Sequence, residues 1–168
     1  MEKKAMKCIP LHDYRPKLKS VFLDRLHTTY YCKRNIVDFL QQVEGKTGLA
    51  ELKQLISSYI ITTQQQLCEL NALYERLNTQ PEEIFVTGFK AYSLEALIAV
   101  LKQQKDPFKN ELTLLNHLQS ICAIDINNDK LLYQMSESLD MVRVDFLSMA
   151  VSNKVVLKSL ERITGTLI

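Results

Sequence analysis

The chain has 168 residues, 46% of them hydrophobic, and its 21 basic and 19 acidic side chains give a net charge of +2. This is the length of one ordinary domain with a substantial core, and the charge balance neither demands nor excludes nucleic acid as a partner. The longest purely apolar run, residues 96–101, is far too short to span a bilayer and no signal peptide is visible, so we expect a soluble cytoplasmic protein.

Residues 1–16 form a predicted basic arm that precedes a single domain over residues 17–164. The arm lacks apolar periodicity, and basic side chains in the first 19 residues clearly outnumber Glu2 and Asp13. The simplest interpretation is a solvated, frayed arm. The alternative is a basic tail that contacts nucleic acid or an acidic partner.

Apolar residues recur every three or four positions in the first half of the chain and predict two long helices. The first begins near Pro16, because proline fits a first helical turn, and it ends near Glu44, just before Gly45. The second covers about residues 49–77 and ends before Pro81.

The second half of the chain predicts three more helices. A short helix covers about residues 92–103. Asp106, followed directly by proline, is a strong start signal for a fourth helix over about residues 107–123. The polar segment DINND, residues 125–129, is interpreted as a turn, and a final long helix covers about residues 129–162.

Four substantial helices and one short helix predict an all-α fold, an up-and-down four-helix bundle with one additional short helix. Antiparallel helices of similar length bring their midpoints to one level, and polar side chains lie near the middle of each long helix. We therefore expect a polar layer that crosses an apolar core. Its candidate members are Lys33, Thr63, Gln64, Gln66, Asn116, His117, Gln119, Glu137 and Asp140.

A di-metal site in such a layer would need several carboxylates that converge with one or two imidazoles. Residues 57–68 contain no Asp, Glu or His, and His117 is the only histidine near a helix midpoint. We therefore expect no metal, no cofactor and no catalytic residue. His117 is interpreted as a hydrogen-bonded structural side chain.

The four cysteines, Cys8, Cys32, Cys68 and Cys122, are far apart and form no CxxC pair, so zinc or thioredoxin-like chemistry is not expected. The last three lie in helical patterns beside apolar residues. We expect them to be small buried hydrophobes in a reducing compartment. No glycine-rich phosphate loop, GxSxG or HExxH motif is present.

Five segments occur in an order that is typical of a known family. They are LDRLHTTYYCKRNI, LAELKQLISSYIITTQQQLCELNALYERL, SLEALI, NHLQ and KLLYQMSESLDMVRVDFLSMAVSN. This ordered set, over residues 18–153, resembles the YciE/YciF-like stress proteins, a ferritin-like family described mainly as a domain of unknown function. The resemblance implies a ferritin-like four-helix bundle, often dimeric, with a carboxylate-bridged di-metal centre in some members.

Most metal-ligand positions of that family correspond to other residue types in this chain. The first-helix glutamate corresponds to Lys33, the second-helix ligands fall within residues 61–66, and the glutamates that flank the fourth-helix histidine are replaced. Glu95 is retained, and Glu137 and Asp140 lie beside the last-helix positions. The degenerate site positions are Lys33, Ile61, Thr62, Gln64, Gln66, Glu95, Asn116, His117, Gln119, Glu137 and Asp140.

Lys33 lies on the apolar stripe of the first helix, where the resemblance places a carboxylate. A buried ammonium without a partner is strongly unfavourable, so the side chain needs either a counter-ion or access to water. One hypothesis pairs it with Glu95, Glu137 or Asp140 as a structural cross-link. The alternative is that the side chain extends along the helix to solvent.

These observations favour a metal-free ferritin-like bundle with a structural, interaction or stress-related role, expected to form a homodimer and not to be an enzyme. One alternative is a degenerate di-metal oxidase or metal-storage protein, whose site would need His117, Glu95, Glu137 and Asp140 to converge. The other alternative is a nucleic-acid-associated bundle that uses the basic arm. No aromatic interleaving marks a base-stacking surface, so nucleic acid is not the expected partner.

Overall fold

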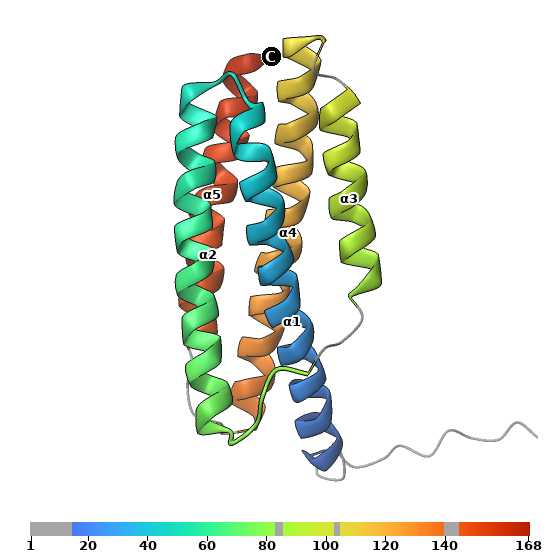
Figure 1. Ribbon diagram of the computed structural model, residues 1–168. Helices are drawn as coiled ribbons and strands as arrows, with labels where there is room; N and C mark the ends of the chain where they lie inside the picture. The colour runs from blue at the N-terminus through green and yellow to red at the C-terminus, as the bar shows by residue number, and fades with distance from the viewer. Residues whose placement is uncertain (1–14, 83–85, 103–104, 140–144) are drawn as a thin grey trace, which may run out of the picture.

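The computed structural model describes residues 15–82, 86–102, 105–139 and 145–168, and the predicted all-α fold is confirmed (Figure 1). These residues form no strand, and none of their helices is both long and apolar enough to cross a membrane. The elements are α1 (Arg15–Val43), η2 (Glu44–Lys46), α2 (Ala50–Arg76), α3 (Thr87–Lys102), α4 (Pro107–Ser138) and α5 (Phe146–Leu167).

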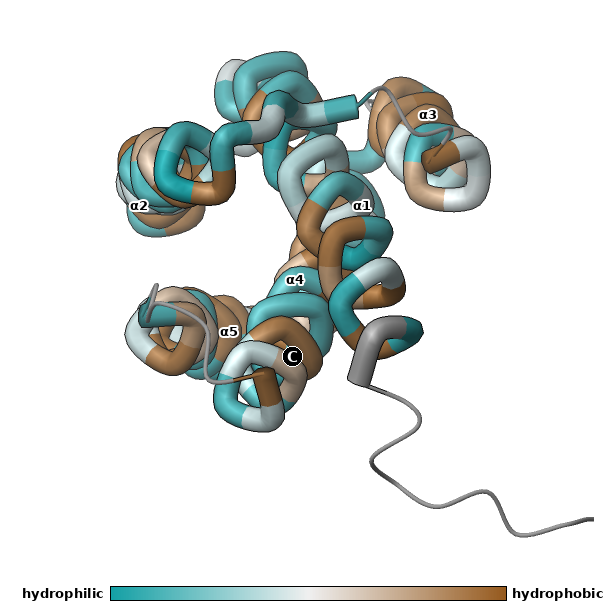
Figure 2. The backbone as a smooth tube through the Cα atoms, turned by 90° about the horizontal axis from the view of Figure 1, so that it is seen from below, coloured by the Kyte–Doolittle hydropathy of each residue, from teal (hydrophilic) through white to brown (hydrophobic). Residues whose placement is uncertain are grey.

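Four long helices surround a common core, and α3 lies outside them (Figures 1 and 2). In order around the core the helices are α1, α2, α5 and α4, and each runs antiparallel to its two neighbours. Helix α3 packs against α1 and α4 and carries the chain from the far end of α2 back to the start of α4. The bundle with one additional short helix is therefore the observed architecture.

Helix α2 ends through a local backbone motif, before the proline that was predicted to break it. Asn78 adopts a φ of 50°, the left-handed conformation that asparagine tolerates better than most residues. Its N–H donates to the carbonyl of Glu75 at 3.0 Å, and the N–H of Thr79 donates to that of Tyr74 at 3.1 Å. Both bonds satisfy carbonyls that the last turn would otherwise leave unpaired.

The predicted boundaries of the last two helices are wrong. Helix α4 continues to Ser138, straight through DINND, and α5 begins only at Phe146. The reason is that Asp125, Ile126 and Asp129 are buried and continue the inward-facing stripe of α4, so tertiary contacts override the turn-forming tendency of Asp and Asn.

The remaining boundaries are closer to the expectation. Asp106 caps α4 as predicted and accepts a hydrogen bond from the Lys109 N–H at 3.2 Å. Helix α3 begins at Thr87, five residues before the expected start. Helix α1 begins at Arg15, and residues 1–14 of the predicted basic arm lie outside the described residues.

The core consists of two apolar clusters stacked along the bundle axis. The upper cluster, at the η2 end in Figure 1, includes Ile36 and Leu40, and the lower cluster includes Phe22 and Leu26. Each of the other long helices also contributes residues to both clusters. In α5, for example, the lower cluster contains Phe146 and Met149, and the upper cluster contains Val156, Leu160 and Ile163. Between the two clusters the inward-facing side chains are polar.

A buried carboxylate on α4 holds the turn that joins α1 to α2. Glu111 accepts hydrogen bonds from the Thr47 hydroxyl at 2.7 Å and from the Gly48 N–H at 2.6 Å. The same hydroxyl accepts the N–H of Leu49, the N-cap residue of α2, at 3.1 Å. Because α2 has no side-chain cap of its own, Glu111 organises its N-terminus from another helix.

We expect Glu111→Ala to lower the free energy of unfolding by about 1–3 kcal/mol, since the Thr47 hydroxyl and the Gly48 N–H lose their shared buried acceptor. Urea unfolding followed by circular dichroism measures the change. Hydrogen exchange should speed up at the first amides of α2. Glu69→Ala, which removes an exposed glutamate from the same bundle, is the control, and equal stability of the two variants would contradict the role given to Glu111.

Candidate functional site

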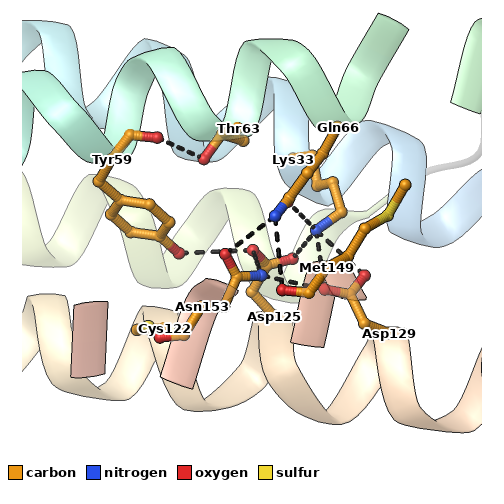
Figure 3. Close-up of polar contacts among 9 residues, drawn as sticks. All are labelled: Lys33, Tyr59, Thr63, Gln66, Cys122, Asp125, Asp129, Met149 and Asn153. Carbon is orange, nitrogen blue, oxygen red and sulfur yellow. Dashed lines mark hydrogen bonds and ion pairs between the residues drawn. The ribbon is translucent and has the colours of Figure 1, made fainter. Parts of the chain in front are cut away.

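The polar layer between the two apolar clusters centres on Lys33, whose side chain is completely buried (Figure 3). Each long helix contributes to it. Helix α1 provides Lys33, α2 provides Gln66, α4 provides Asp125 and Asp129, and α5 provides Asn153. All five residues are at most 4% exposed, so the layer has almost no contact with solvent.

The Lys33 ammonium uses all three of its N–H groups. Its Nζ donates to Asp125 Oδ1 at 2.7 Å, to Gln66 Oε1 at 2.8 Å and to Asp129 Oδ2 at 3.1 Å. Two of these acceptors belong to carboxylates, so the contacts are also ion pairs. An ammonium that is both paired and fully hydrogen-bonded meets the conditions under which a charge is tolerated in a core.

Two amide side chains complete the network. Asn153 Nδ2 donates to Asp125 Oδ2 at 2.9 Å and to Asp129 Oδ2 at 3.0 Å, and therefore joins the two carboxylates. Gln66 Nε2 donates to Asn153 Oδ1 at 3.2 Å and to the Met149 carbonyl at 3.5 Å. Each amide thus accepts one bond and donates two, which ties α2 and α5 into the layer.

Tyr59 and Cys122 border the layer on the side of the upper cluster. The Tyr59 hydroxyl donates to Asp125 Oδ2 at 3.4 Å, and the Cys122 thiol donates to the Asn153 carbonyl at 3.2 Å. Burial, reinforced by the negative charge of Asp125, raises the pKa of Tyr59 well above its usual value and that of Cys122 to about 12. Both groups are therefore neutral near pH 7, and Cys122 is not a thiolate ligand or nucleophile.

The expectation that three cysteines are buried is correct for two of them. Cys32 and Cys122 are buried, and burial raises the pKa of Cys32 to about 12 as well. Cys68 is exposed, because its position on α2 faces away from the core, although Leu67 precedes it directly in the sequence.

Both hypotheses for Lys33 need correction. The side chain does not extend to solvent. It does form the predicted buried cross-link, but its partners are Asp125 and Asp129, not Glu95 or Glu137. Asp140, the third partner considered, lies outside the described residues.

Some of the site residues predicted from the sequence lie in the polar layer, and others lie outside it. Lys33, Thr63 and Gln66 lie in or beside the layer, with the Thr63 hydroxyl bonded to the Tyr59 carbonyl at 2.8 Å. On the same helix Ile61 is 57% exposed. Also outside the layer are Thr62, which is half-buried, and Gln64, which is exposed.

His117 lies on the outer side of α4, where it contacts α3. Its Nδ1 is 3.1 Å from the Tyr92 hydroxyl, and partial burial lowers its pKa, partly offset by the charge of Glu95. Asn116 is exposed, and Gln119 donates to the Thr164 hydroxyl on α5 at 2.8 Å. The expected structural role of His117 agrees with these contacts.

The described members of the alternative oxidase site do not converge. Glu137 is exposed near the end of α4 and accepts a hydrogen bond from Tyr133, one turn earlier. It follows His117 by 20 residues on the same helix, a separation of roughly 30 Å at the helical rise of about 1.5 Å per residue. Ligands to one metal centre cannot be so far apart.

Sequence reasoning missed Asp125, Asp129 and Asn153. The two aspartates were placed in a turn, although their spacing of four continues the stripe that runs through Cys122 and Leu132. With α4 drawn at its full length, Asp125 lies near its midpoint and therefore at the level of Lys33. Asn153 could have been recognised in the same way, because it follows Met149 by four residues and therefore lies on the same inward face of α5.

The residues of the layer do not fit the di-metal centre implied by the family resemblance. Such a centre needs several carboxylates and imidazoles, whereas the layer offers two carboxylates, two amides and no imidazole. The Lys33 ammonium also lies within 2.7–3.1 Å of the best oxygen donors, where it has no lone pair to offer a metal. Among the described residues, no group of three or more His, Cys, Asp or Glu has a metal-binding arrangement.

Electrostatics keeps the ammonium charged. Burial alone would lower the pKa of Lys33, but the combined charges and hydrogen bonds of Asp125 and Asp129 outweigh it and raise the pKa above its usual value. Lys33 is therefore a cation near neutral pH.

We expect Lys33→Met to lower the free energy of unfolding by about 3–5 kcal/mol, because it removes the counter-ion of two buried aspartates. The measurement is urea unfolding at pH 8, where carboxylates are most strongly ionised. Lys130→Met, at an exposed position of α4, is the matched control and should change stability by less than about 0.5 kcal/mol. If the two variants were equally stable, Lys33 would not be the central cross-link.

Two solved bacterial structures share this fold. YcfI from Rhodopseudomonas palustris, described as a candidate structural protein, matches with a TM-score of 0.70 and 17% identity over 89% of this chain and 92% of its own. The E. coli stress protein YciF matches with a TM-score of 0.67 and 17% identity, over 89% and 91% of the two chains. The likeness confirms the fold as a ferritin-like four-helix bundle with one additional short helix.

Sequence comparisons give the family. A search of curated proteins finds no match. A family model described as a domain of unknown function, DUF892, matches residues 17–142, which is most of the chain, and the predicted resemblance to YciF-like proteins is confirmed. The chain therefore belongs to the DUF892 family.

Proposed function

We propose that this protein is a structural or interaction module of the ferritin-like class, in which an internal ion pair takes the central place that metals occupy in di-metal bundles. The observation that carries this proposal is the position of the Lys33 ammonium. It lies between the Gln66 amide of α2 and two carboxylates of α4, in contact with both neighbouring helices. A cation that is part of the chain can cross-link the bundle but cannot cycle between oxidation states or bind oxygen.

Three features support a non-enzymatic role. Both carboxylates of the layer already accept hydrogen bonds from Lys33 and Asn153, and the thiol and phenol beside them are held neutral by burial. The layer is closed to solvent, so a substrate has no route to it in this conformation. The pockets described among these residues lie elsewhere, one of about 240 Å³ between the N-terminus of α2 and the C-terminus of α5 and one of about 210 Å³ between α1 and α3.

The structural and stress descriptions of the two similar structures belong to those proteins. They make a stress-related, non-catalytic role the natural hypothesis for this chain, and we propose a cytoplasmic location on the basis of its composition. Fold alone does not decide function, so the proposal depends on the chemistry of the layer.

We expect no stoichiometric iron binding when the metal-free protein is titrated with ferrous iron and then exposed to oxygen, because the central donors are already occupied by Lys33. Ultraviolet absorbance and elemental analysis after desalting are the measurements. Lys130→Met should behave like the unmodified protein. Two irons per chain that survive desalting would overturn the metal-free proposal.

We also propose that the protein self-associates, with α5 as the contacting helix. Leu147, Val151 and Val155 are spaced by four on its outer face and are 46%, 51% and 62% exposed. Residues four apart lie on one face of a helix, so the three side chains form a continuous apolar stripe. A second copy of this chain could cover that stripe by placing the same helix against it.

The expected solution mass is twice that of one chain, measured by size-exclusion chromatography with light scattering. Val151→Glu should yield monomers, because it places a charge in the middle of the buried stripe. Val21→Glu, at an exposed valine of α1, should leave the dimer intact. A monomeric unmodified protein, or a dimer that tolerates Val151→Glu, would disprove this interface.

A further inference from the structure

The polar layer contains two carboxylates but only one cation. The side chains of Lys33, Asp125 and Asp129 are all 0% exposed, so no bulk solvent screens their charges. If both aspartates were ionised, the layer would carry a net charge of −1 inside an apolar core. A buried charge without compensation is strongly unfavourable, and a titratable group normally removes it by binding a proton.

The hydrogen bonds distinguish the two carboxylates. Asp125 receives bonds on both oxygens, from Lys33 at 2.7 Å on Oδ1 and from Asn153 and Tyr59 on Oδ2. Asp129 receives its bonds on Oδ2 alone, from Lys33 at 3.1 Å and from Asn153 at 3.0 Å. The ionised form is therefore better stabilised at Asp125, because more donors point at it and the ammonium is closer.

The second oxygen of Asp129 is buried and has no hydrogen-bond partner among the described residues. Lys33 Nζ lies 3.1 Å from it, at ion-pair distance, but the ammonium N–H groups are directed at other acceptors. An anionic oxygen without a donor is costly in a core, and a neutral carboxylic acid reduces that cost.

We propose that the layer binds one proton on folding, that Asp129 carries it, and that the bundle therefore has a built-in response to pH. In the protonated state the layer is neutral, with Lys33 positive, Asp125 negative and Asp129 uncharged. When the proton leaves, two anionic side chains share one ammonium and one amide. This inference is independent of the proposed structural role and of self-association.

The groups that face Asp129 account for the direction of its titration. Helix α1 contributes Lys33, which favours ionisation, and α4 contributes Asp125, which opposes it. Helix α2 contributes Tyr59, whose hydroxyl donates a hydrogen bond to Asp125. Helix α5 contributes only the uncharged Asn153. Desolvation is the largest influence, followed by Lys33 and then Asp125, and together they raise the pKa of Asp129 to about 7.

The pKa of Asp129 is higher in the folded protein than in the unfolded chain, and this difference determines how the stability of the fold changes with pH. The unfolded value for aspartate is about 3.9, so the folded protein binds more protons than the unfolded chain between about pH 4 and pH 7. The stabilisation is complete below about pH 4 and decreases as the pH rises towards 7. The contribution of Asp129 is therefore lost on alkalinisation, opposite to that of an exposed salt-bridged aspartate.

The first experiment compares the pH dependence of unfolding in the unmodified protein and in Asp129→Asn. Asparagine mimics the neutral acid and cannot ionise. Relative to this variant, the unfolding constant of the unmodified protein should rise by up to tenfold per pH unit between about pH 4 and pH 7 and then level off. Asp38→Asn, at an exposed aspartate of α1, is the control and should keep the pH profile of the unmodified protein.

The second experiment observes the proton directly. Carbon-13 labelling of aspartate allows each side-chain carboxyl to be followed by NMR in the intact folded protein. One resonance should titrate near pH 7 and disappear in Asp129→Asn. In Asp125→Asn, the titration of the Asp129 resonance should move to lower pH, because the competing anion has gone.

Both experiments test whether Asp129 carries a proton, and their results do not depend on whether the protein binds metal or forms a dimer. A resonance near pH 7 that vanishes in Asp129→Asn, together with the flattened stability profile, supports it. No aspartate that titrates above pH 5, or a resonance near pH 7 that vanishes only in Asp125→Asn, overturns it. Should Asp129→Asn fail to fold, the NMR titration of the unmodified protein and of Asp125→Asn still gives the answer.

Discussion

The structure depends on one buried ionic cluster, in which the ammonium of Lys33 pairs with the carboxylates of Asp125 and Asp129. Removing these charges from water has a large desolvation cost, which close contacts and hydrogen bonds between the charged groups offset. The layer supplies three hydrogen bonds from the ammonium and two amides that pair with each other, and it leaves one oxygen of Asp129 without a partner among the described residues. Every long helix takes part, so a change at one member affects all four.

The same layer places a cation of the chain itself at the centre of the four-helix bundle. The core consists of two apolar clusters that pack independently above and below the layer. In a di-metal bundle, the charge at this level is balanced by ions from solution. In this chain a lysine from α1 supplies the cation at this level, at distances of 2.7 and 3.1 Å from its carboxylate partners.

The sequence predicts the fold well and the site only in part. Periodic apolar residues in α1 and α2 identified both helices, and Lys33, Thr63 and Gln66 were recognised as a polar layer. The partners on α4 were missed because Asp and Asn at residues 125–129 favour turns locally, while their burial against other helices cannot be read from local preference. The error lay in the predicted junction between the last two helices, which moved the predicted midpoint of α4 away from its true level.

The polar layer between the two apolar clusters also limits how the four helices are aligned along the bundle axis. Leucine, isoleucine and phenylalanine pack almost equally well after a helix slides by one turn, about 5.4 Å, so apolar contacts alone define the axial register weakly. The same slide would carry an ammonium away from its carboxylates and leave both against aliphatic side chains. The charged layer thus favours a single axial register of the four helices over registers that are shifted by one turn.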